Sequence, residues 1–258
     1  MIRRAAGYLI NTPNPVPMPL RPIAWLCAVV FVLLGGATLG AAPDGGRWQA
    51  VLAAGDVAEP VFDNAIAGFG QWLAARGVIP GDIHRLSARP FDPATEAASA
   101  GQLLRRIALL PGRPGDRCLI FVTSHGEHGR GLYLAYSHEM LTPAALAQAL
   151  SVGCANLPTV VIVSSCYSGS FASGPMLAPN RIILTAARAD RPSFGCQADR
   201  TYTVFDECLL AALPRSRLWR GIAEASLACV RQREQQMGVL PSEPRHFFGA
   251  KVRDLALP

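Results

Sequence analysis

Four short apolar runs recur between residues 48 and 187, and they predict buried strands. They read WQAVLAA from Trp48, CLIFVTS from Cys118, TVVIVSS from Thr159 and RIILTAA from Arg181. None of them alternates cleanly between apolar and polar positions. Such continuity is typical of parallel strands that are covered on both faces, so the runs predict the interior of a parallel sheet.

Segments with helical periodicity separate and follow these runs. The expected helices cover residues 64–77, 92–112, 142–153, 203–214 and 216–238. In the second helix we place Glu96 in the first turns, and in the third we expect Thr142 as the N-cap with Pro143 at the first helical position. Strands that alternate with helices predict an α/β fold, in which a mainly parallel sheet lies between two layers of helices.

The N-terminal segment differs from the rest of the chain. No charged residue occurs from Ile23 to Ala42, arginines precede this run, and small residues close it. This order is typical of a secretory signal peptide, although twenty apolar residues can also just span a bilayer. We therefore expect residues 1–42 to be a signal peptide or, alternatively, a retained membrane anchor. Residues 45–258 are expected to form one domain that is exported to the periplasm or cell envelope.

Charge and cysteine usage narrow the function classes. The formal net charge of +6 includes Arg3, Arg4 and Arg21 of the leader, and the remaining arginines are scattered without interleaved aromatic residues. This pattern argues against nucleic-acid binding. No Cys or His spacing suits zinc, so neither a metal nor a cofactor is expected.

The cysteines outside the leader are open to several readings, because an oxidising compartment permits disulfides. They are Cys118, Cys154, Cys166, Cys196, Cys208 and Cys229. Cys118 precedes a strand, while Cys208 and Cys229 fall in helical apolar patterns, and we expect ordinary buried thiols at these three positions. If Cys166 stays a free thiol, at least one of the other five must also be unpaired.

Two of the four strand ends carry reactive side chains. His125 follows the second strand in TSHG, and Cys166 follows the third in SSCYSG. Ligands of open parallel sheets bind outside the carboxyl ends of the strands, so neighbouring strands would place both side chains on one surface. A thiol and an imidazole there form a nucleophile and its base. Gly126 and Gly169 let the backbone turn beside them, and an amide after His125 could donate to an oxyanion.

These residues resemble a known family. TSHG with GLYLA, SSCYSGSF and ILTAARADRPSFGC are similar to motifs of the legumain-type cysteine peptidases, above all their short bacterial members. VFDNA after the first strand and EPRHFFG near the end extend the resemblance from about Trp48 to Phe248. The family implies a caspase-like three-layer α/β/α fold. It also implies an endopeptidase that hydrolyses peptide bonds through a thioester acyl-enzyme, with transpeptidation as a variant when an amine captures that intermediate.

The resemblance also implies roles for single residues. His125 matches the catalytic histidine and Cys166 the nucleophile, with the backbone amides of Gly126 and Cys166 as the oxyanion hole. Ser193, and as a weaker candidate Asp199, would line the pocket for the residue before the scissile bond. Legumains place a basic residue after the first strand where this chain has Asp63, so an asparagine preference cannot be transferred and an Arg or Lys preference is conceivable. Asp63 could equally be a helix cap or an ion-pair partner.

Rival readings stay open at this point. His128 lies in a glycine-rich stretch and is better explained as a solvated loop histidine. Cys196 is the one rival nucleophile, for which a disulfide or other structural role is the simpler reading. A catalytically silent binding or scaffold protein of the same fold is the alternative function, although the presence of both His125 and Cys166 argues against it. A hydrolase acting on a small ester would need a narrow pocket over Cys166 in place of an open groove.

Overall fold

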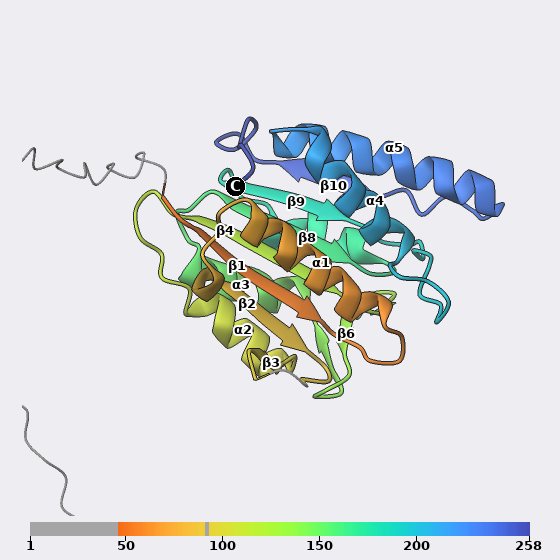
Figure 1. Cartoon of the computed structure of the whole chain (residues 1–258), viewed down its shortest axis with the longest axis horizontal. Coiled ribbons are helices and arrows are strands. Elements are labelled where there is room, and N and C mark those ends of the chain that lie inside the picture. The colour runs from red at the N-terminus through yellow and green to blue at the C-terminus, as the bar shows by residue number, and fades with distance from the viewer. Residues whose placement is uncertain (1–45, 91–92) are drawn as a thin grey trace, which may run out of the picture. The chain divides into compact units, whose positions relative to one another are not determined.

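A mostly parallel seven-stranded sheet forms the centre of the molecule (Figure 1). The structure, a computed structural model, describes residues 46–90 and 93–258. In spatial order the strands are β10 (Arg245–Phe248), β9 (Arg181–Thr185), β8 (Thr159–Ser164), β4 (Arg117–Thr123), β1 (Trp48–Ala54), β2 (Ile83–Ser87) and β3 (Thr95–Ala97). Only β10 runs antiparallel to its neighbour. The four predicted apolar runs are β1, β4, β8 and β9, and the first three of these lie side by side in the order β1, β4, β8.

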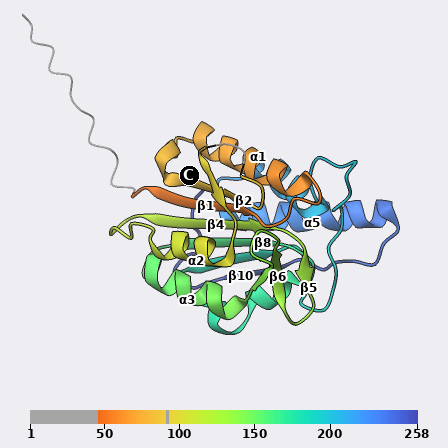
Figure 2. The same cartoon turned by 90° about the horizontal axis from the view of Figure 1, so that it is seen from below.

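Helices cover both faces of this sheet (Figure 2). On one face lie α1 (Val61–Ala75), α4 (Val204–Ala212) and α5 (Trp219–Met237); on the other lie α2 (Ala100–Ala108) and α3 (Pro143–Gly153). Two apolar clusters fill the spaces between the layers. Leu119 and Phe121 of β4 point into the first cluster, while Ile120 and Val122 point into the second. The predicted three-layer α/β/α sandwich with a mainly parallel sheet is confirmed.

Shorter elements complete the domain. A three-stranded antiparallel sheet follows β4 and consists of β5 (Gly126–Glu127), β6 (Gly131–Leu134) and β7 (Glu139–Leu141). The 3-10 turns are η1 (Pro80–Asp82), η2 (Ser168–Ala172), η3 (Gly174–Met176) and η4 (Leu213–Arg215). Both β5 and η2 begin within a few residues of a predicted catalytic residue that follows a strand, so the local structure changes direction at both places.

The expectation of one helix over residues 92–112 is wrong in its first half. Glu96 lies in the edge strand β3, which pairs with β2, and the helix begins only at Ala100. The side-chain oxygen of Ser99 accepts a hydrogen bond from the backbone N–H of Gln102, and this N-cap fixes the start. By contrast, the predicted cap at Thr142 is confirmed, because its hydroxyl accepts from the N–H of Ala145.

The strands β2, β3 and β10 were not predicted. They carry charged or polar residues, as in IHRLS, TEA and RHFF, and they lie at or next to the edges of the sheet. An edge strand contacts the core less fully than a central strand, so its sequence lacks the apolar run by which the central strands were found.

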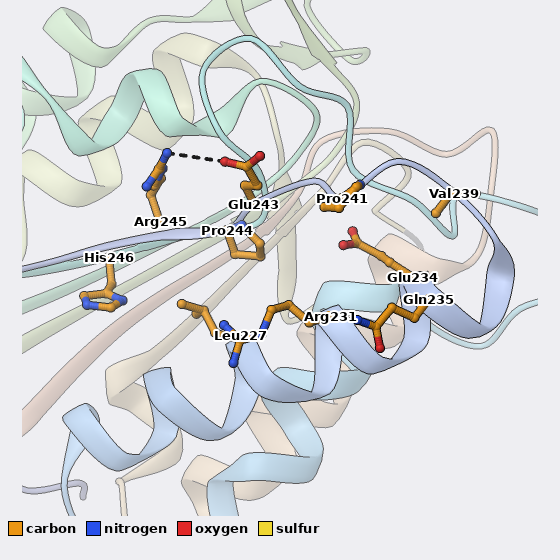
Figure 3. A pocket seen from close by; sticks show the side chains of 10 residues that line it. All are labelled: Leu227, Arg231, Glu234, Gln235, Val239, Pro241, Glu243, Pro244, Arg245 and His246. Atoms are coloured by element: carbon orange, nitrogen blue, oxygen red, sulfur yellow. Dashed lines mark ion pairs between the residues drawn. The ribbon is translucent and has the colours of Figure 1, made fainter.

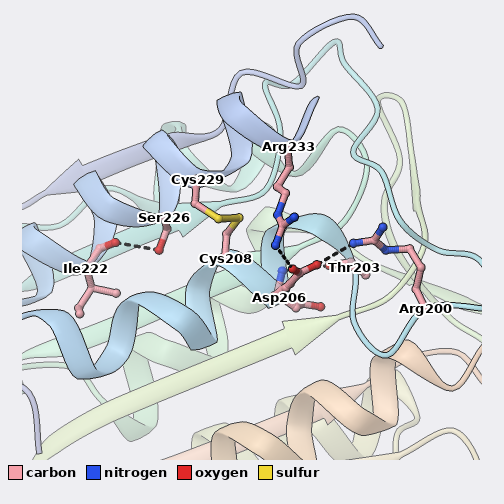
Figure 4. Close-up of a disulfide and its surroundings, with 9 residues drawn as sticks. Arg200, Thr203, Asp206, Cys208, Ile222, Ser226, Cys229 and Arg233 are labelled. Atoms are coloured by element: carbon pink, nitrogen blue, oxygen red, sulfur yellow. Dashed lines mark hydrogen bonds and ion pairs between the residues drawn. A yellow bond between two sulfur atoms is a disulfide. The ribbon is translucent and has the colours of Figure 1, made fainter. Parts of the chain in front are cut away.

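Two disulfides correct the expectation of buried thiols. Cys118 in β4 is bonded to Cys154 at the end of α3, and Cys208 in α4 is bonded to Cys229 in α5. Figure 4 shows the second disulfide between the two helices. The sequence could not identify the pairs because the partners meet only through the packing of separate elements. Cys166 and Cys196 remain as free thiols among the described residues.

Removing either disulfide is expected to destabilise the domain by about 3 kcal/mol, because a cross-link restricts the unfolded chain. The Cys118–Cys154 pair is 36 residues apart and the Cys208–Cys229 pair 21, so the first should contribute slightly more, by about 0.5 kcal/mol. Urea unfolding of the two double-alanine variants measures this difference. Alkylation of the unreduced, denatured wild type at any of these four cysteines would contradict the pairing.

The predicted signal peptide or anchor over residues 1–42 lies outside the described residues, and it stays a prediction. In the part of the chain that is described, none of the helices has the length and apolar character needed to cross a membrane.

Candidate active site

The ends of β4 and β8 bring the two predicted catalytic residues to the same level of the sheet. These strands are parallel neighbours, and their last residues, Thr123 and Ser164, are register partners. The pairing continues one residue further, since the N–H of Ser124 donates to the carbonyl of Ser164 at 3.1 Å. His125 and Cys166 each lie two residues beyond the register pair. The sequence prediction that they project from one edge of the sheet is therefore supported by the strand register.

The strand ends that precede the two residues also face the same layer of helices. On β4 the odd-numbered residues Leu119 and Phe121 point towards the layer of α1, α4 and α5, and on β8 the even-numbered Val160 and Ile162 do so. Because side chains alternate along a strand, the last residues Thr123 and Ser164 point towards that layer, and the His125 ring contacts Phe62 of α1 in it.

His125 is held by contacts of its ring and of its backbone. The half-buried imidazole packs edge-on against the buried ring of Phe62 in the first turn of α1, with 5.2 Å between ring centroids. The carbonyl of His125 accepts a hydrogen bond from the N–H of Tyr133 in β6 at 2.9 Å, and the Ser124 hydroxyl donates to the carbonyl of Tyr133 at 2.7 Å. The small sheet thus fixes the backbone from which the imidazole projects.

Cys166 is a half-buried free thiol that lies against Ser193. The backbone N–H of Ser193 donates to the sulfur at 3.3 Å, the thiol faces the carbonyl of Ser193 at 3.6 Å, and the two side chains are 3.7 Å apart. The segment after β9, which the sequence analysis chose as a pocket wall, therefore does reach the thiol.

A sharp turn follows Cys166. Tyr167 adopts a left-handed conformation with φ of 59°, which is uncommon for a bulky residue, and its N–H donates to the carbonyl of Arg191 at 2.8 Å. At Gly169 a Cβ would lie 2.5 Å from the backbone nitrogen of Ala189, so only glycine fits this approach. Backbone strain of this kind is concentrated at functional sites, where surrounding contacts maintain it.

Gly126 lies directly beside the nucleophile. A Cβ at this position would be only 2.2 Å from the carbonyl oxygen of Cys166. In the small sheet Gly126 faces Leu132, and the bond from the Tyr133 N–H to the His125 carbonyl makes this a non-hydrogen-bonded pair. In such a pair the N–H of Gly126 points away from β6. It is thus not used in pairing with that strand.

Comparison with known proteins agrees with this geometry. Residues 100–217, which include both strand ends, match the model of the Peptidase C13 family. The resemblance to the legumain-type cysteine peptidases is confirmed. The chain is accordingly a cysteine-type peptidase, which is a class of hydrolase.

A solved structure shows the same fold as this chain. The chain is similar to the structure described as "structure of pro-sf-caspase-1", with a TM-score of 0.55 and 14% sequence identity. The match covers 79% of this chain and 92% of that chain, and it is one of 187 solved chains that match. At this identity the likeness shows the caspase-like fold alone. No curated protein sequence matches the chain.

The other two predicted pocket residues of this peptidase contact different surroundings. Asp63 is half-buried in the first turn of α1, where burial raises the pKa of its carboxyl, while a hydrogen bond with Ser87 and the charge of Arg89 oppose the rise. These contacts belong to the β2 side of α1 and fit the alternative reading of Asp63 as a structural partner. Asp199 is exposed in a turn between Ser193 and α4. The structure joins neither residue to Cys166, and their role in the pocket stays a prediction.

Cys196, the rival nucleophile, differs from Cys166 in its environment. Burial raises the pKa of its thiol to about 12, and the negative charges of Cys166 and nearby carboxylates add to the shift. At neutral pH Cys196 is thus a thiol and not a nucleophilic thiolate. Of the two readings given for Cys196, a disulfide or another structural role, the structure excludes the disulfide because the thiol is free. A structural role fits its packing against the core.

Several residues of the site were not found from the sequence. Phe62 and Tyr167 stood in the quoted motifs, yet nothing in the sequence shows that their rings contact histidines: Phe62 lies against His125, and Tyr167 lies against His128 with 5.3 Å between ring centroids. His128 is exposed as expected but does contact the turn after Cys166.

Within residues 46–90 and 93–258, no three His, Cys, Asp or Glu side chains gather as a metal site would require.

Two hollows lie near the end of α5. A pocket of about 420 Å³ between α5 and β10 is lined by residues that include Leu227, Glu234, Pro244 and His246, and it contains neither His125 nor Cys166 (Figure 3). A wider groove of about 590 Å³ is lined by Pro192 and Phe194, the two neighbours of Ser193, together with residues 239–241. The second hollow is therefore continuous with the segment that contacts the nucleophile.

Proposed function

We propose that the protein is a cysteine endopeptidase in which Cys166 and His125 act as a catalytic dyad. The observation that carries this proposal is the register of β4 and β8, which brings the residues that follow both strands to the same level at one edge of the sheet. A thiol and an imidazole in this relation are the minimal pair for nucleophilic catalysis of acyl transfer.

The reaction follows from the chemistry of these two side chains. His125 accepts the proton of the Cys166 thiol, and the thiolate attacks the carbonyl carbon of the scissile peptide bond. The tetrahedral intermediate then collapses to a thioester while the imidazolium returns its proton to the leaving amine. Water, activated by the neutral imidazole, hydrolyses the thioester and restores the free thiol. An amine that replaces this water would give transpeptidation from the same acyl-enzyme.

Backbone amides are proposed to hold the negative charge of the intermediate. The N–H of Gly126 is directed away from β6, and the glycine lies against the backbone of Cys166. Together with the amide of Cys166, it would form an oxyanion hole at the place where the carbonyl oxygen of a substrate becomes charged. The close approach that only glycine permits supports this assignment.

The substrate is proposed to be a peptide that lies along the Ser193 segment. Ser193 contacts the sulfur, and the open groove beyond its neighbours Pro192 and Phe194 offers room for side chains next to the scissile bond. An open groove fits an extended chain better than a small ester. Asp63 and Asp199 remain candidates for reading the residue before the cut.

Export to the periplasm or cell envelope completes the proposal. The order of arginines, an uncharged apolar run and small residues in residues 1–42 motivates this localisation. We favour cleavage of this segment as a signal peptide over its retention as a membrane anchor. The two disulfides support it independently, since structural disulfides persist in oxidising compartments and are rare in a reducing cytosol.

A thiol-reactive peptide probe tests the proposed nucleophile. An acyloxymethyl ketone peptide should label the wild-type domain once, at Cys166, and the Cys196→Ala variant should be labelled at an unchanged rate. The Cys166→Ala variant should remain folded and unlabelled, as measured by intact mass and peptide mapping. Labelling that is lost with Cys196 instead would remove Cys166 from the nucleophile's role.

A further inference from the structure

A buried acid lies in the layer of helices that the strand ends before the dyad face. Asp206, in the first turn of α4, has no exposed surface. Its neighbours in the helix, Val204, Phe205, Cys208 and Leu209, are apolar core residues. Figure 4 shows Asp206 at the same end of α4 as Thr203. Charged side chains are almost never buried completely unless they have partners, so the contacts of this carboxyl need an explanation.

The carboxyl of Asp206 lies close to the ends of both strands that lead to the dyad. The hydroxyl of Thr123, the last residue of β4, donates to its Oδ2 atom at 2.8 Å. The hydroxyl of Ser164, the last residue of β8, lies close enough to lower the pKa of the carboxyl, whose Oδ1 atom has no hydrogen-bond partner among the described residues. Thr123 and Ser164 are the register partners that precede His125 and Cys166 by two residues each. Two residues of strand rise by about 6.6 Å, so the carboxyl lies about one side-chain layer below the dyad.

Asp206 also acts on the segment that contacts the nucleophile. Its negative charge contributes to the raised pKa of Cys196, which lies three residues after Ser193. The carboxyl is therefore close to the end of β4, the end of β8 and the segment after β9. These are the three parts of the chain whose relative placement determines the geometry of the site.

We propose that Asp206 is a positioning residue of the peptidase, whose carboxyl holds the ends of β4 and β8 together so that His125 and Cys166 keep a reactive separation. This inference rests on the proposed function, and it adds a residue that does not touch the substrate. A displacement of about 1 Å between reacting groups can lower a rate by about 100-fold. A carboxyl that fixes the strand ends one side-chain layer below the dyad can therefore affect the catalytic rate.

Burial of the Asp206 carboxyl lowers the stability of the folded state, and this loss argues for a functional role. Burial raises the pKa of the Asp206 carboxyl to about 6, although hydrogen bonds to nearby hydroxyl groups oppose the shift. Because its pKa in the folded state exceeds the ordinary value of 3.8, the folded state loses stability as the pH rises between these values. That loss is fully present at neutral pH. An apolar residue would avoid it, and functional sites are where such local costs are retained.

A purely structural role for Asp206 must be separated from this one. The Thr203 hydroxyl accepts from the N–H of Asp206 at 3.1 Å, so the residue also belongs to the N-cap of α4. A capping role would change the melting temperature and leave kcat of the folded enzyme unchanged. A positioning role lowers kcat in folded enzyme, while KM changes little because the substrate groove is intact.

The test compares Asp206→Leu and Asp206→Asn with wild type well below their melting temperatures. We expect kcat to fall about 10- to 100-fold in Asp206→Leu with KM within about twofold, and to recover largely in Asp206→Asn, whose amide oxygen can still accept from Thr123. Thr123→Val should also lower kcat, and adding it to Asp206→Leu should cause no further loss. Unchanged kcat in folded Asp206→Leu, or fully additive losses, would overturn the proposal.

A second readout keeps this test apart from that of the proposed function. The rate at which iodoacetamide alkylates Cys166, measured by peptide mapping, depends on the thiolate that His125 supports and needs no peptide substrate. We expect this rate to fall at least about fivefold in Asp206→Leu. If the wild type cleaves no peptide, the proposed function fails, and an unchanged alkylation rate then also overturns the role of Asp206.

Discussion

Replacing His125 by alanine is expected to lower kcat for peptide hydrolysis by about 1,000-fold. The thiol of Cys166 would then lack its general base, and the leaving amine would lack a proton donor. The side chain is half-buried and makes one ring contact, with Phe62, so the variant should fold. Initial rates with a peptide that the wild type cleaves measure this effect.

The chain supplies a matched control for this prediction. His128 is a second histidine near the site, since its ring contacts Tyr167 beside the nucleophile, but it is exposed in the loop after β5. We expect His128→Ala to keep kcat within about threefold of wild type. Activity of His125→Ala should rise as increasing pH ionises the thiol, because hydroxide then replaces the missing base. A larger loss of kcat in His128→Ala than in His125→Ala would show that His125 is not the general base.

Replacing Gly126 by alanine is expected to lower kcat/KM by at least about 100-fold, although the change adds a single methyl group. The new Cβ would lie 2.2 Å from the carbonyl oxygen of Cys166, so the strand ends would have to separate. That separation moves the nucleophile and the proposed oxyanion donor together. Steady-state kinetics with the same peptide, combined with thermal unfolding, measure the effect on catalysis and on stability.

Gly101→Ala is the control for this second prediction. Gly101 lies in the first turn of α2, and a Cβ there meets no atom within 4 Å. Alanine should stabilise this helix by up to about 1 kcal/mol and leave kcat/KM unchanged. If Gly126→Ala behaves like Gly101→Ala, the close approach to Cys166 does not constrain catalysis, and the proposed oxyanion hole loses its main support.

The parts of the fold that the sequence predicted are those with the strongest burial. Central strands such as β4 and β8 lie under helices on both faces, so nearly every position is apolar and the run is visible without a structure. Their C-terminal ends are equally visible, because the apolar run stops at Thr123 and at Ser164. This is why His125 and Cys166 could be placed at strand ends from residue order alone.

The errors fall where a neighbour, and not the local sequence, decides the outcome. Residues 95–97 became an edge strand because β2 offers them a pairing partner, whereas their composition also suits a helix. Cys118 and Cys208 became disulfide-bonded because α3 and α5 bring Cys154 and Cys229 to them. Such contacts join positions that are far apart along the chain, so no local pattern reports them.

By itself, the sequence determined the layered fold and pointed to the two candidate catalytic residues, because burial on both faces and abrupt strand ends are visible in residue order. Only the tertiary structure decided which groups surround that pair. The contact of Ser193 with the sulfur, the approach of Gly126 to Cys166 and the hydrogen bond between Thr123 and Asp206 all depend on packing between distant segments.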